Sequence, residues 1–376
     1  MSVRVIFAGG GTGGHLYPAL NIAAAMREMR PDVEPMFVGA RRGVEARVLP
    51  EKGVPHTLLP LEPIRRDRVW RNWRLVPSMS GAIWGLCRLM LRTRPSLVVG
   101  TGGYASGPAC GWALLVGVPI ALQEQNSYPG LTTRWLSPFA RQVHLGFPEA
   151  EARLRAGRRT SVQAHGNPIL PPDRGVDRLR ARRSFGLSPD ATVLLVVGGS
   201  QGARAINEAL AGALEGVAAG EGARPSSLEI LWATGPMHIE AVRERLAPLG
   251  VGNWVRAIGY IDDMPGALAA ADIAVSRAGA MGTAELLAWG IPSILVPLPT
   301  SAAEHQTHNA AALESFGAAI ALLERDMTPA RLWEDVSGLA GDQARRERMA
   351  ARTRERARPD AARRIAADLL TIVEGR

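Results

Sequence analysis

The sequence predicts an α/β protein with two doubly wound lobes, each a parallel sheet covered by helices. Apolar runs of strand length alternate with longer segments of helical period through most of the 376 residues, which is typical of parallel sheets. The alternation stops at a proline-rich stretch, HGNPILPPDRG at 165–175, and then begins again. A glycine-rich turn follows the first strand of each half, so the two halves are expected to be built alike.

Each apolar run defines an expected strand. In the first half the strands are expected at 3–8, 35–40, 96–100, 119–123 and 142–147, and in the second half at 192–199, 228–234, 255–260, 273–276 and 292–297. The last fifty residues are rich in Ala, Arg and Glu and predict helices only. We therefore expect one domain at 1–168, a second at 169–345, and helices at 346–376 that pack back on the first domain.

The composition favours a cytosolic globular protein. Hydrophobic residues make up 47% of the chain, enough to fill two cores. The two cysteines, Cys87 and Cys110, have apolar neighbours and form no CxxC pattern, so neither a disulfide framework nor a cysteine metal site is expected. No secretory signal and no long apolar span is expected either.

The positive charge is concentrated in the first half. Residues 1–170 contain 21 Lys or Arg and 10 Asp or Glu, whereas 171–376 contain 23 and 25. Within 65–94, eight arginines accompany Asp67 and three tryptophans, Trp70, Trp73 and Trp84. Arginine, tryptophan and an apolar helix face together favour an anionic membrane surface; a plain solvated face is the alternative. Nucleic acid is disfavoured because no recognition motif is present.

The glycine-rich turns predict anion sites. Gly9-Gly10-Gly11-Thr12-Gly13-Gly14-His15 lies between the first strand and a helix, and Gly198-Gly199-Ser200-Gln201-Gly202 repeats this arrangement. Glycines let backbone N–H groups approach a phosphate, and a helix N-terminus favours negative charge. The spacing Gly9-x-Gly11-x-x-Gly14 matches a dinucleotide fingerprint, but Arg41 and Arg42 stand where NAD binding needs an acid, so NADP remains only as an alternative.

A third glycine signal, Ala278 to Glu285, follows the strand at 273–276. A carboxylate at Glu285 can accept hydrogen bonds from two ribose hydroxyls. The alternative is that Glu285 is there only because an acid near a helix N-terminus is favourable.

Eight motifs resemble one family. GGTGGH at 10–15, GGYASGP at 102–108, QEQNSYPGLTTRWLS at 123–137, GNP at 166–168, VVGGSQGAR at 196–204, IDDM at 261–264, AGAMGTAE at 278–285 and EHQTHNA at 304–310 are similar to the MurG family of bacterial N-acetylglucosaminyltransferases. The resemblance spans about 300 residues. It implies a GT-B architecture, in which two Rossmann-like lobes face each other across a cleft, the acceptor on the first and the nucleotide sugar on the second.

The resemblance also implies the reaction. GlcNAc moves from UDP-GlcNAc to the C4 hydroxyl of MurNAc in undecaprenyl-diphosphate-MurNAc-pentapeptide (lipid I), with inversion, to give lipid II for peptidoglycan synthesis, cell shape and cell division. The implied partners are these two substrates, an anionic membrane at the cytoplasmic face of the cell membrane, other cell-wall synthesis proteins, and no nucleic acid. No cofactor is implied.

Carried over residue by residue, the resemblance implies a donor site. Ser200 and Gln201 would contact the diphosphate, the Ile261 backbone the uracil, and Glu285 the ribose. The full implied set is Thr12, Gly13, Gly14 and Asn126 from the first lobe, and Ser200, Gln201, Ile261, Ala280, Met281, Gly282, Thr283, Ala284, Glu285, Gln306 and Asn309 from the second. The sequence departs from the family at Leu170, where an arginine is usual; Arg204 could supply the missing contact.

The acceptor side is implied to be lined by His15, Gly103, Tyr104 and Gln125. His15 is the leading candidate for the general base, since an imidazole titrates near neutrality. Glu124 is the alternative base, with His15 then orienting the acceptor or only capping a helix; Asn126 completes the catalytic set. Tyr104 either contacts the acceptor or is simply packed.

Two further expectations concern metal and membrane. No DxD motif is present and Asp262-Asp263 resemble a helix cap, so we expect donor binding without a metal. We expect Trp73, Trp84, Arg88, Leu91 and Arg92 to share the membrane surface.

Other functions are considered as alternatives. A GT-B enzyme acting on another membrane lipid, such as diacylglycerol, would share the lobes and the basic surface, and a nucleotide-sugar binding module would lack an intact acceptor side.

Overall fold

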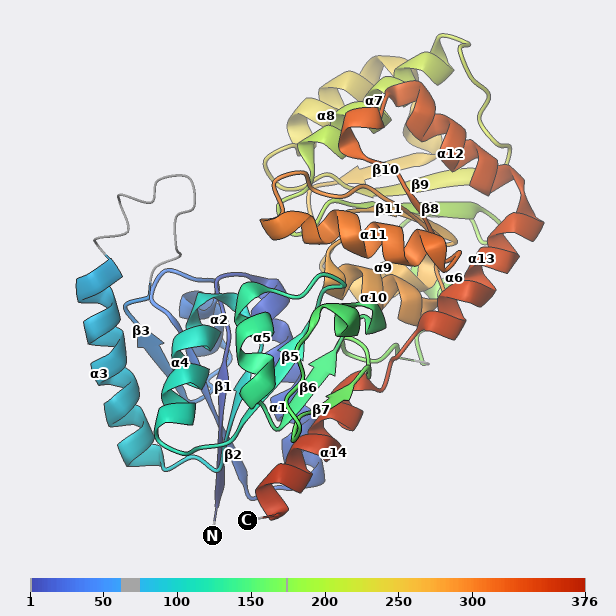
Figure 1. Ribbon diagram of the computed structural model, residues 1–376. Coiled ribbons are helices and arrows are strands. Elements are labelled where there is room, and N and C mark those ends of the chain that lie inside the picture. Colours follow the sequence, from blue (N-terminus) through green and yellow to red (C-terminus); the bar gives the residue numbers. More distant parts are fainter. Residues whose placement is uncertain (1, 62–74, 174, 376) are drawn as a thin grey trace. The chain divides into compact units, whose positions relative to one another are not determined.

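The computed structural model describes residues 2–61, 75–173 and 175–375. The chain forms two compact units: unit 1 contains residues 1–170 and 359–376, and unit 2 contains 171–358. The last helix, α14 (Ala361–Glu374), belongs to unit 1 and lies beside the sheet of that unit (Figure 1). No helix of the described residues is long and apolar enough to cross a bilayer.

Unit 1 is a parallel sheet in the order β3-β2-β1-β4-β5-β6-β7. Its strands are β1 (Val3–Ala8), β2 (Val33–Ala40), β3 (His56–Leu59), β4 (Leu97–Gly100), β5 (Ile120–Glu124), β6 (Gln142–Leu145) and β7 (Ser161–Gln163). Its helices are α1 (Gly13–Met29), α2 (Glu45–Glu51), α3 (Leu75–Thr93), α4 (Gly103–Leu115), α5 (Leu131–Leu136), η2 (Ser137–Phe139), η3 (Pro148–Arg153) and α14 (Ala361–Glu374).

Unit 2 is a parallel sheet in the order β10-β9-β8-β11-β12-β13. Its strands are β8 (Thr192–Val197), β9 (Leu228–Ala233), β10 (Val255–Ile258), β11 (Ile273–Ser276), β12 (Ser293–Leu295) and β13 (Ala319–Ala321). Its helices are α6 (Arg178–Ser184), α7 (Arg204–Ala218), α8 (Ile239–Leu246), η4 (Ala247–Leu249), η5 (Val251–Asn253), α9 (Met264–Ala270), α10 (Ala280–Trp289), η6 (Ala302–Glu304), α11 (His305–Ser315), η7 (Glu324–Asp326), α12 (Pro329–Gly341) and α13 (Gln343–Arg356).

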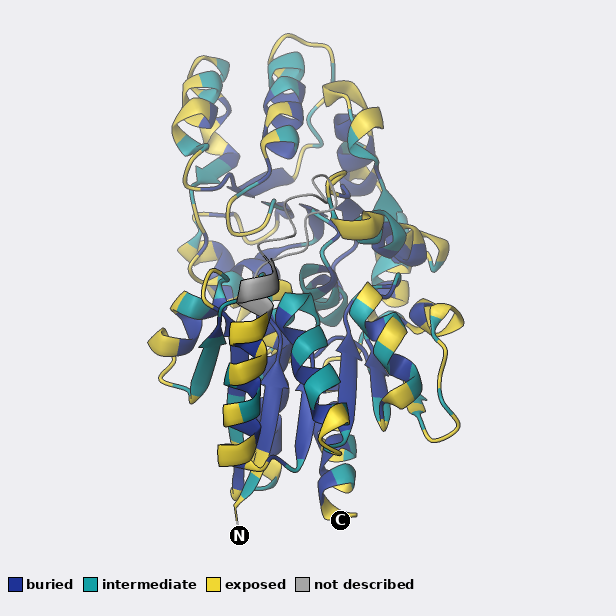
Figure 2. Ribbon diagram, turned by 60° about the vertical axis from the view of Figure 1, so that its left-hand side comes forward, coloured by how far each residue is buried: buried dark blue, intermediate teal, exposed yellow. Residues whose placement is uncertain are grey.

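Both sheets are buried on their two faces, as the continuous apolar strands require. In β1, Val5 and Phe7 contribute to the core beneath α1, whereas Ile6 and Ala8 contribute to the core beneath α3 and α4. Figure 2 shows the same arrangement, with buried strands between helices whose outer faces are exposed. The prediction of two parallel α/β sheets is confirmed.

In each sheet, the first strands are added on one side of the central strand and the later strands on its other side. The reversal lies between β1 and β4 in unit 1 and between β8 and β11 in unit 2. Loops at the carboxyl ends of the strands on either side of such a reversal are where doubly wound sheets bind ligands. The glycine turns of the sequence follow these central strands.

The C-terminal helices divide between the units. α13, which the sequence analysis grouped with α14, contacts α10 and α12 of unit 2. α14 packs on α1 of unit 1 through a stripe of buried residues, Ile365, Leu369 and Val373. The chain therefore passes from unit 2 to unit 1 at Pro359 rather than at residue 346.

Candidate active site

The first glycine turn connects β1 to α1. Gly11 has a φ of +89°, which side chains other than glycine rarely adopt, and Thr12 is the extended residue before the helix. Gly13 and Gly14 form the first helical positions, so their N–H groups have no partner within the helix. Backbone N–H groups of this kind are suited to bind an anion.

A buried acid supports this turn, and the sequence analysis missed it. Both oxygens of the fully buried Glu45 accept backbone hydrogen bonds, from Gly11 N at 2.8 Å and from Ala40 N at 2.8 Å. A Cβ on Gly10, Gly39 or Gly43 would collide with the Glu45 side chain. These three glycines thus make room for a carboxylate that fixes the turn.

The second turn of unit 1, between β4 and α4, lies against the first. Gly102 and Gly103 have φ values of +94° and +74°, and a Cβ on Gly103 would collide with the carbonyl oxygen of Gly10. The Tyr104 ring lies over Gly11, where it would contact any side chain at that position. Burial and the nearby Glu45 carboxylate raise the pKa of Tyr104, so its hydroxyl stays protonated and can donate a hydrogen bond.

His15 lies where these two turns meet. Its Nδ1 is 3.1 Å from Thr12 Oγ1, and its carbonyl accepts a hydrogen bond of 2.8 Å from Thr101 Oγ1 at the end of β4. The ring is half-buried and packs on Gly102, because a Cβ there would approach the ring carbon Cδ2. The structure therefore brings His15, Gly103 and Tyr104 of the predicted acceptor set together.

Glu124 is a buried anchor at the end of β5. Its carboxylate accepts hydrogen bonds from Asn126 N at 3.1 Å, Gly130 N at 2.9 Å and Thr133 Oγ1 at 2.6 Å, and the Asn126 side-chain amide lies 3.4 Å away. These bonds hold the loop at 125–130 and the start of α5. The side chain is only 4% exposed, which favours a positioning role.

Gln125 is buried beside this loop. Its side-chain amide donates to Thr101 O at 2.8 Å and to Gln123, so it joins the ends of β4 and β5. Asn167 of the GNP motif donates to Gln125 O at 2.9 Å. Asn167 is a second residue whose part in the site the sequence analysis did not assign.

In unit 2, the turn after β8 packs on the turn after β9. A Cβ on Gly202 would collide with Thr234 O, and a Cβ on Gly235 would collide with Gln201 O. Ser200 and Gln201 lie exposed at the tip of the turn, just before α7 begins at Arg204. They are therefore accessible to a diphosphate.

Helix α10 carries six of the eleven donor residues predicted for unit 2. It begins at Ala280 immediately after Gly279, and Met281, Gly282 and Ala284 are partly accessible while Thr283 is buried and bonds to Ala280 O. Burial raises the pKa of Glu285. Among the described residues Glu285 has no hydrogen-bond or ionic partner, so its carboxylate is available to a ligand that donates hydrogen bonds.

The segment before α11 has a strained backbone. Ala303 and Glu304 adopt φ values of +52° and +53°, which are uncommon for residues with a side chain and cluster at ligand sites. Gln306 accepts from Leu298 N at 3.0 Å. Asn309, which is fully buried, donates to Ala278 O at 3.1 Å and so connects α11 to the turn before α10.

These turns surround a cavity of about 620 Å³ in unit 2. The lining comes from the loops after β8, β11 and β12 and from the adjoining helices: Gly198, Gly199, Gly202, Ala203, Arg204, Ala205, Glu208, Arg277, Gly279, Leu298, Gln306 and Glu324. Of the residues singled out in the sequence, Gln306 and Arg204 line it directly, while Ser200, Gln201 and Ala280 are chain neighbours of lining residues. Arg277, which bonds Glu324 at 2.5 Å, was not predicted.

The remaining predicted residues lie apart from this lining. Ile261 is buried at the start of the loop before α9, and Asp263 accepts from Gly266 N at 2.9 Å, so the predicted helix cap at Asp262-Asp263 is confirmed. Leu170 is 72% exposed. Arg204 lines the cavity and pairs with Glu208 at 2.6 Å.

The predicted membrane residues lie on α3, apart from Trp73, which is outside the described residues. Trp84 and Leu91 are 67% and 71% exposed, and Arg88 lies over the Trp84 ring at 5.7 Å. Trp84, Arg88, Leu91 and Arg92 are spaced so that they share one helix face. Figure 2 shows this outer face of α3 as largely exposed.

Two Rossmann-like units with glycine-rich turns at both sheet reversals are the architecture of a glycosyltransferase of the GT-B fold. The N-terminal domain profile of Glycosyltransferase family 28 matches residues 5–145 and its C-terminal domain profile matches 193–365. The chain belongs to glycosyltransferase family 28 and, within it, to the MurG family of N-acetylglucosamine transferases.

Similarity to curated relatives extends over the full length. The chain is 40% identical to a UDP-N-acetylglucosamine–N-acetylmuramyl-(pentapeptide) pyrophosphoryl-undecaprenol N-acetylglucosamine transferase of Moorella thermoacetica, covering 99% of this chain and 100% of the relative. It is 41% identical to the protein of the same name from Salinibacter ruber, covering 100% and 99%.

Solved structures agree. The crystal structure of Acinetobacter baumannii MurG matches with a TM-score of 0.78 at 27% identity, over 99% of both chains. A putative UDP-N-acetylglucosamine 2-epimerase from Listeria monocytogenes matches with a TM-score of 0.69 at 15% identity, over 100% of this chain and 98% of that one, and shares the fold.

Proposed function

We propose that this enzyme transfers GlcNAc from UDP-GlcNAc to the C4 hydroxyl of MurNAc in undecaprenyl-diphosphate-MurNAc-pentapeptide, forming the β-1,4-linked disaccharide of lipid II. The observation that carries the proposal is the cavity at the sheet reversal of unit 2, in a chain that matches the Moorella transferase from end to end. The attacking hydroxyl displaces UDP in one step, so the anomeric configuration inverts.

Unit 2 supplies the donor site. The turn at Gly198–Gly202 and the N-termini of α7 and α10 offer backbone N–H groups to the diphosphate, and Arg204 adds a positive charge. Glu285 accepts hydrogen bonds from the ribose, and Gln306 and Asn309 contact the hydroxyls of GlcNAc. Fixed donors of this kind stabilise the negative charge that grows on the departing UDP, so the donor is bound without a metal.

Unit 1 supplies the base and the acceptor site. His15 Nε2 takes the proton of the C4 hydroxyl while Nδ1–H donates to Thr12 Oγ1, a tautomer that the 3.1 Å separation allows. Glu124 serves as a positioning residue, because its oxygens already accept hydrogen bonds from the backbone and from Thr133. The turn at Gly102-Gly103, with Tyr104, receives the lipid diphosphate.

The test is UDP release from UDP-GlcNAc with and without a soluble short-chain analogue of lipid I, in buffer containing EDTA. We expect release only when the analogue is present, and we expect EDTA to leave the rate unchanged. UDP-GlcNAc binding without release, or release with diacylglycerol in place of the analogue, would assign a different lipid acceptor. Activity lost in EDTA and restored by magnesium would contradict metal-free donor binding.

We also propose that α3 holds the enzyme on the cytoplasmic face of the cell membrane. Trp84 and Leu91 are exposed apolar side chains beside Arg88 and Arg92, a combination that suits the boundary between acyl chains and anionic headgroups. The lipid acceptor stays in the bilayer, so an enzyme held there meets it at the surface.

Co-sedimentation with anionic vesicles tests this surface. We expect the double variant Trp84→Ala, Leu91→Ala to bind vesicles about 30- to 1,000-fold more weakly, since each side chain contributes on the order of 1 to 2 kcal/mol when buried. The variant Leu179→Ala, which removes an exposed leucine of α6, is the matched control and should bind normally. Equal binding by all three proteins would exclude α3 as the membrane surface.

A further inference from the structure

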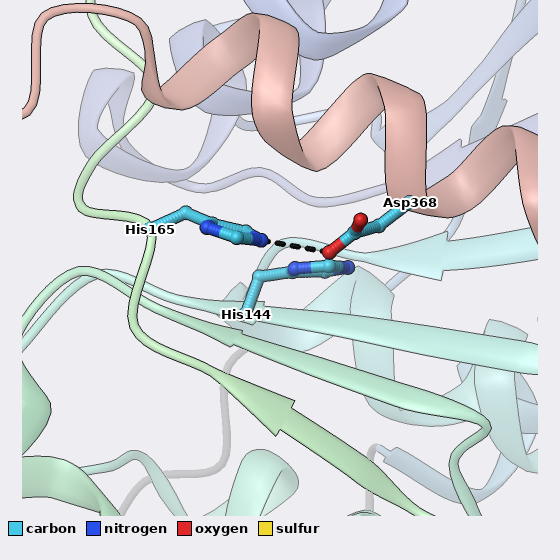
Figure 3. Close-up of side chains that lie close together, drawn as sticks. All are labelled: His144, His165 and Asp368. Atoms are coloured by element: carbon cyan, nitrogen blue, oxygen red, sulfur yellow. Dashed lines mark hydrogen bonds and ion pairs between the residues drawn. The ribbon is translucent and has the colours of Figure 1, made fainter.

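A cluster of two histidines and an aspartate lies at the β6–β7 edge of the unit 1 sheet (Figure 3). The glycine turns of the candidate active site follow other strands, β1 and β4. His144 comes from β6, His165 follows β7, and Asp368 comes from α14. His144 is fully buried. Each of the three residues can offer a ligand atom, and these atoms lie within 4.8 Å of one another.

The hydrogen bonds around His144 determine which of its nitrogens carries the proton. The side-chain amide nitrogen of Gln142 donates to Asp368 O at 2.9 Å and to Thr371 Oγ1 at 3.3 Å, so the amide oxygen of Gln142 faces His144 Nε2, at 3.1 Å. An amide oxygen only accepts. Nε2 of a neutral His144 therefore bears the hydrogen, and Nδ1 carries a lone pair.

That lone pair has no partner. His144 Nδ1 is buried and makes no hydrogen bond with the described part of the chain, although buried polar atoms are nearly always satisfied. Figure 3 shows the His144 ring beside the contact between His165 and Asp368. A neutral imidazole whose other nitrogen donates to an amide oxygen is the form in which histidine binds metals.

The other two residues make the cluster accessible. His165 Nε2 contacts Asp368 Oδ2 at 2.7 Å, and these side chains are 18% and 36% exposed. The two histidine rings stack with their centroids 5.6 Å apart. An ion can therefore reach the cluster from solvent. It would replace the hydrogen in the hydrogen bond between His165 and Asp368.

We propose that His144 Nδ1, His165 Nε2 and the Asp368 carboxylate form a binding site for a divalent transition metal ion, with Zn²⁺ the best match. Two imidazole nitrogens and one carboxylate suit zinc, with water as the fourth ligand. Tetrahedral zinc ligands lie about 3.3 Å apart, so on binding the 2.7 Å contact between His165 and Asp368 lengthens and the wider separations, up to 4.8 Å, shorten, chiefly by rotation of the partly exposed Asp368 side chain.

The site joins the last helix of the chain to the edge of the sheet. α14 already packs its apolar stripe on α1, and a metal at Asp368 adds a link from the polar side of the same helix to β6 and to the residue after β7. An ion that binds only the folded unit stabilises it. The assigned role is therefore structural and independent of sugar transfer.

The test uses the full-length protein after chelator treatment and desalting. We expect it to bind one equivalent of Co²⁺ with a visible absorption band that Zn²⁺ abolishes, and we expect Zn²⁺ to raise its melting temperature. In Asp368→Asn, which keeps a hydrogen-bond acceptor for His165, and in His165→Gln, the affinity should fall by at least about 10-fold. His56→Gln, a change to a histidine of β3, is the matched control and should bind normally.

Three results would overturn the site: no Co²⁺ or Zn²⁺ binding by the unaltered protein, equal affinity in Asp368→Asn, or equal loss in the His56→Gln control. Circular dichroism of each variant without metal shows whether it is folded. If Asp368→Asn is folded and lowers the melting temperature equally with and without Zn²⁺, the cluster is a metal-free contact between α14 and the sheet.

Discussion

Replacing His15 with alanine is expected to lower kcat by about 100- to 10,000-fold, the contribution usual for a general base. The change should lower kcat and leave the affinity for UDP-GlcNAc unchanged, because the donor cavity belongs to unit 2. Steady-state UDP release gives kcat, and calorimetric titration with UDP-GlcNAc gives the affinity. The change removes a half-buried ring at the start of α1, so the variant should remain folded.

Two comparisons make this result specific. His56→Ala alters a histidine of β3 in the same unit and should leave kcat unchanged. Thr12→Val removes the hydroxyl beside His15 Nδ1 and should lower kcat by less than His15→Ala, with little change in KM. Near-normal turnover by His15→Ala with intact donor binding would eliminate His15 as the base and return the role to Glu124.

Replacing Glu45 with alanine is expected to have the largest effect on stability. The change leaves the N–H groups of Gly11 and Ala40 without their acceptor, and each buried unsatisfied donor costs about 1 to 3 kcal/mol. It also leaves a cavity among Gly10, Gly39 and Gly43. We expect the free energy of unfolding to fall by about 2 to 5 kcal/mol, as urea denaturation would measure.

The control variants separate the hydrogen bonds from the charge. Glu45→Gln keeps one acceptor oxygen and should fall between the unaltered protein and the alanine variant, whereas Glu51→Ala, at the exposed end of α2, should be neutral. We also expect Glu45→Ala to lose most of its transferase activity, because the turn that carries His15 loses its support. Unchanged stability in Glu45→Ala would show that the turn holds its shape without the carboxylate.

The central strands were predictable from sequence, whereas three of the four edge strands were not. β1, β8 and β11 match the predicted ranges closely because most of their residues are apolar and buried between helices on both faces of the sheet. β3, β7 and β13 were missed. Each has a neighbour on one side only and is shorter and more exposed, so the apolar pattern that reveals a strand is weak there.

The glycine turns of the candidate site were predictable from the sequence, but the buried residue that holds the first turn in place was not. Gly11, Gly103 and the turn before α7 were recognisable from glycine spacing between a strand and a helix. Glu45 was not, because an acid after β2 is expected to bind a ribose, whereas the Glu45 side chain is buried and accepts hydrogen bonds from the backbone. Its glycine surroundings come from separate loops that meet only in the folded unit. The individual roles in the donor and acceptor sites come from the family resemblance and stay predictions.

The position of α14 affects how the protein is made. The ribosome releases residues 1–170 first, but the helix that covers part of the core beneath α1 is at residues 361–374. Until α14 has been synthesised, the apolar side of α1 that will meet Ile365 and Leu369 has no cover from this helix, and exposed surface of this kind promotes aggregation. Unit 1 therefore completes its folding only after all of unit 2 has been synthesised, and a chain that lacks α14 would be defective in its first domain.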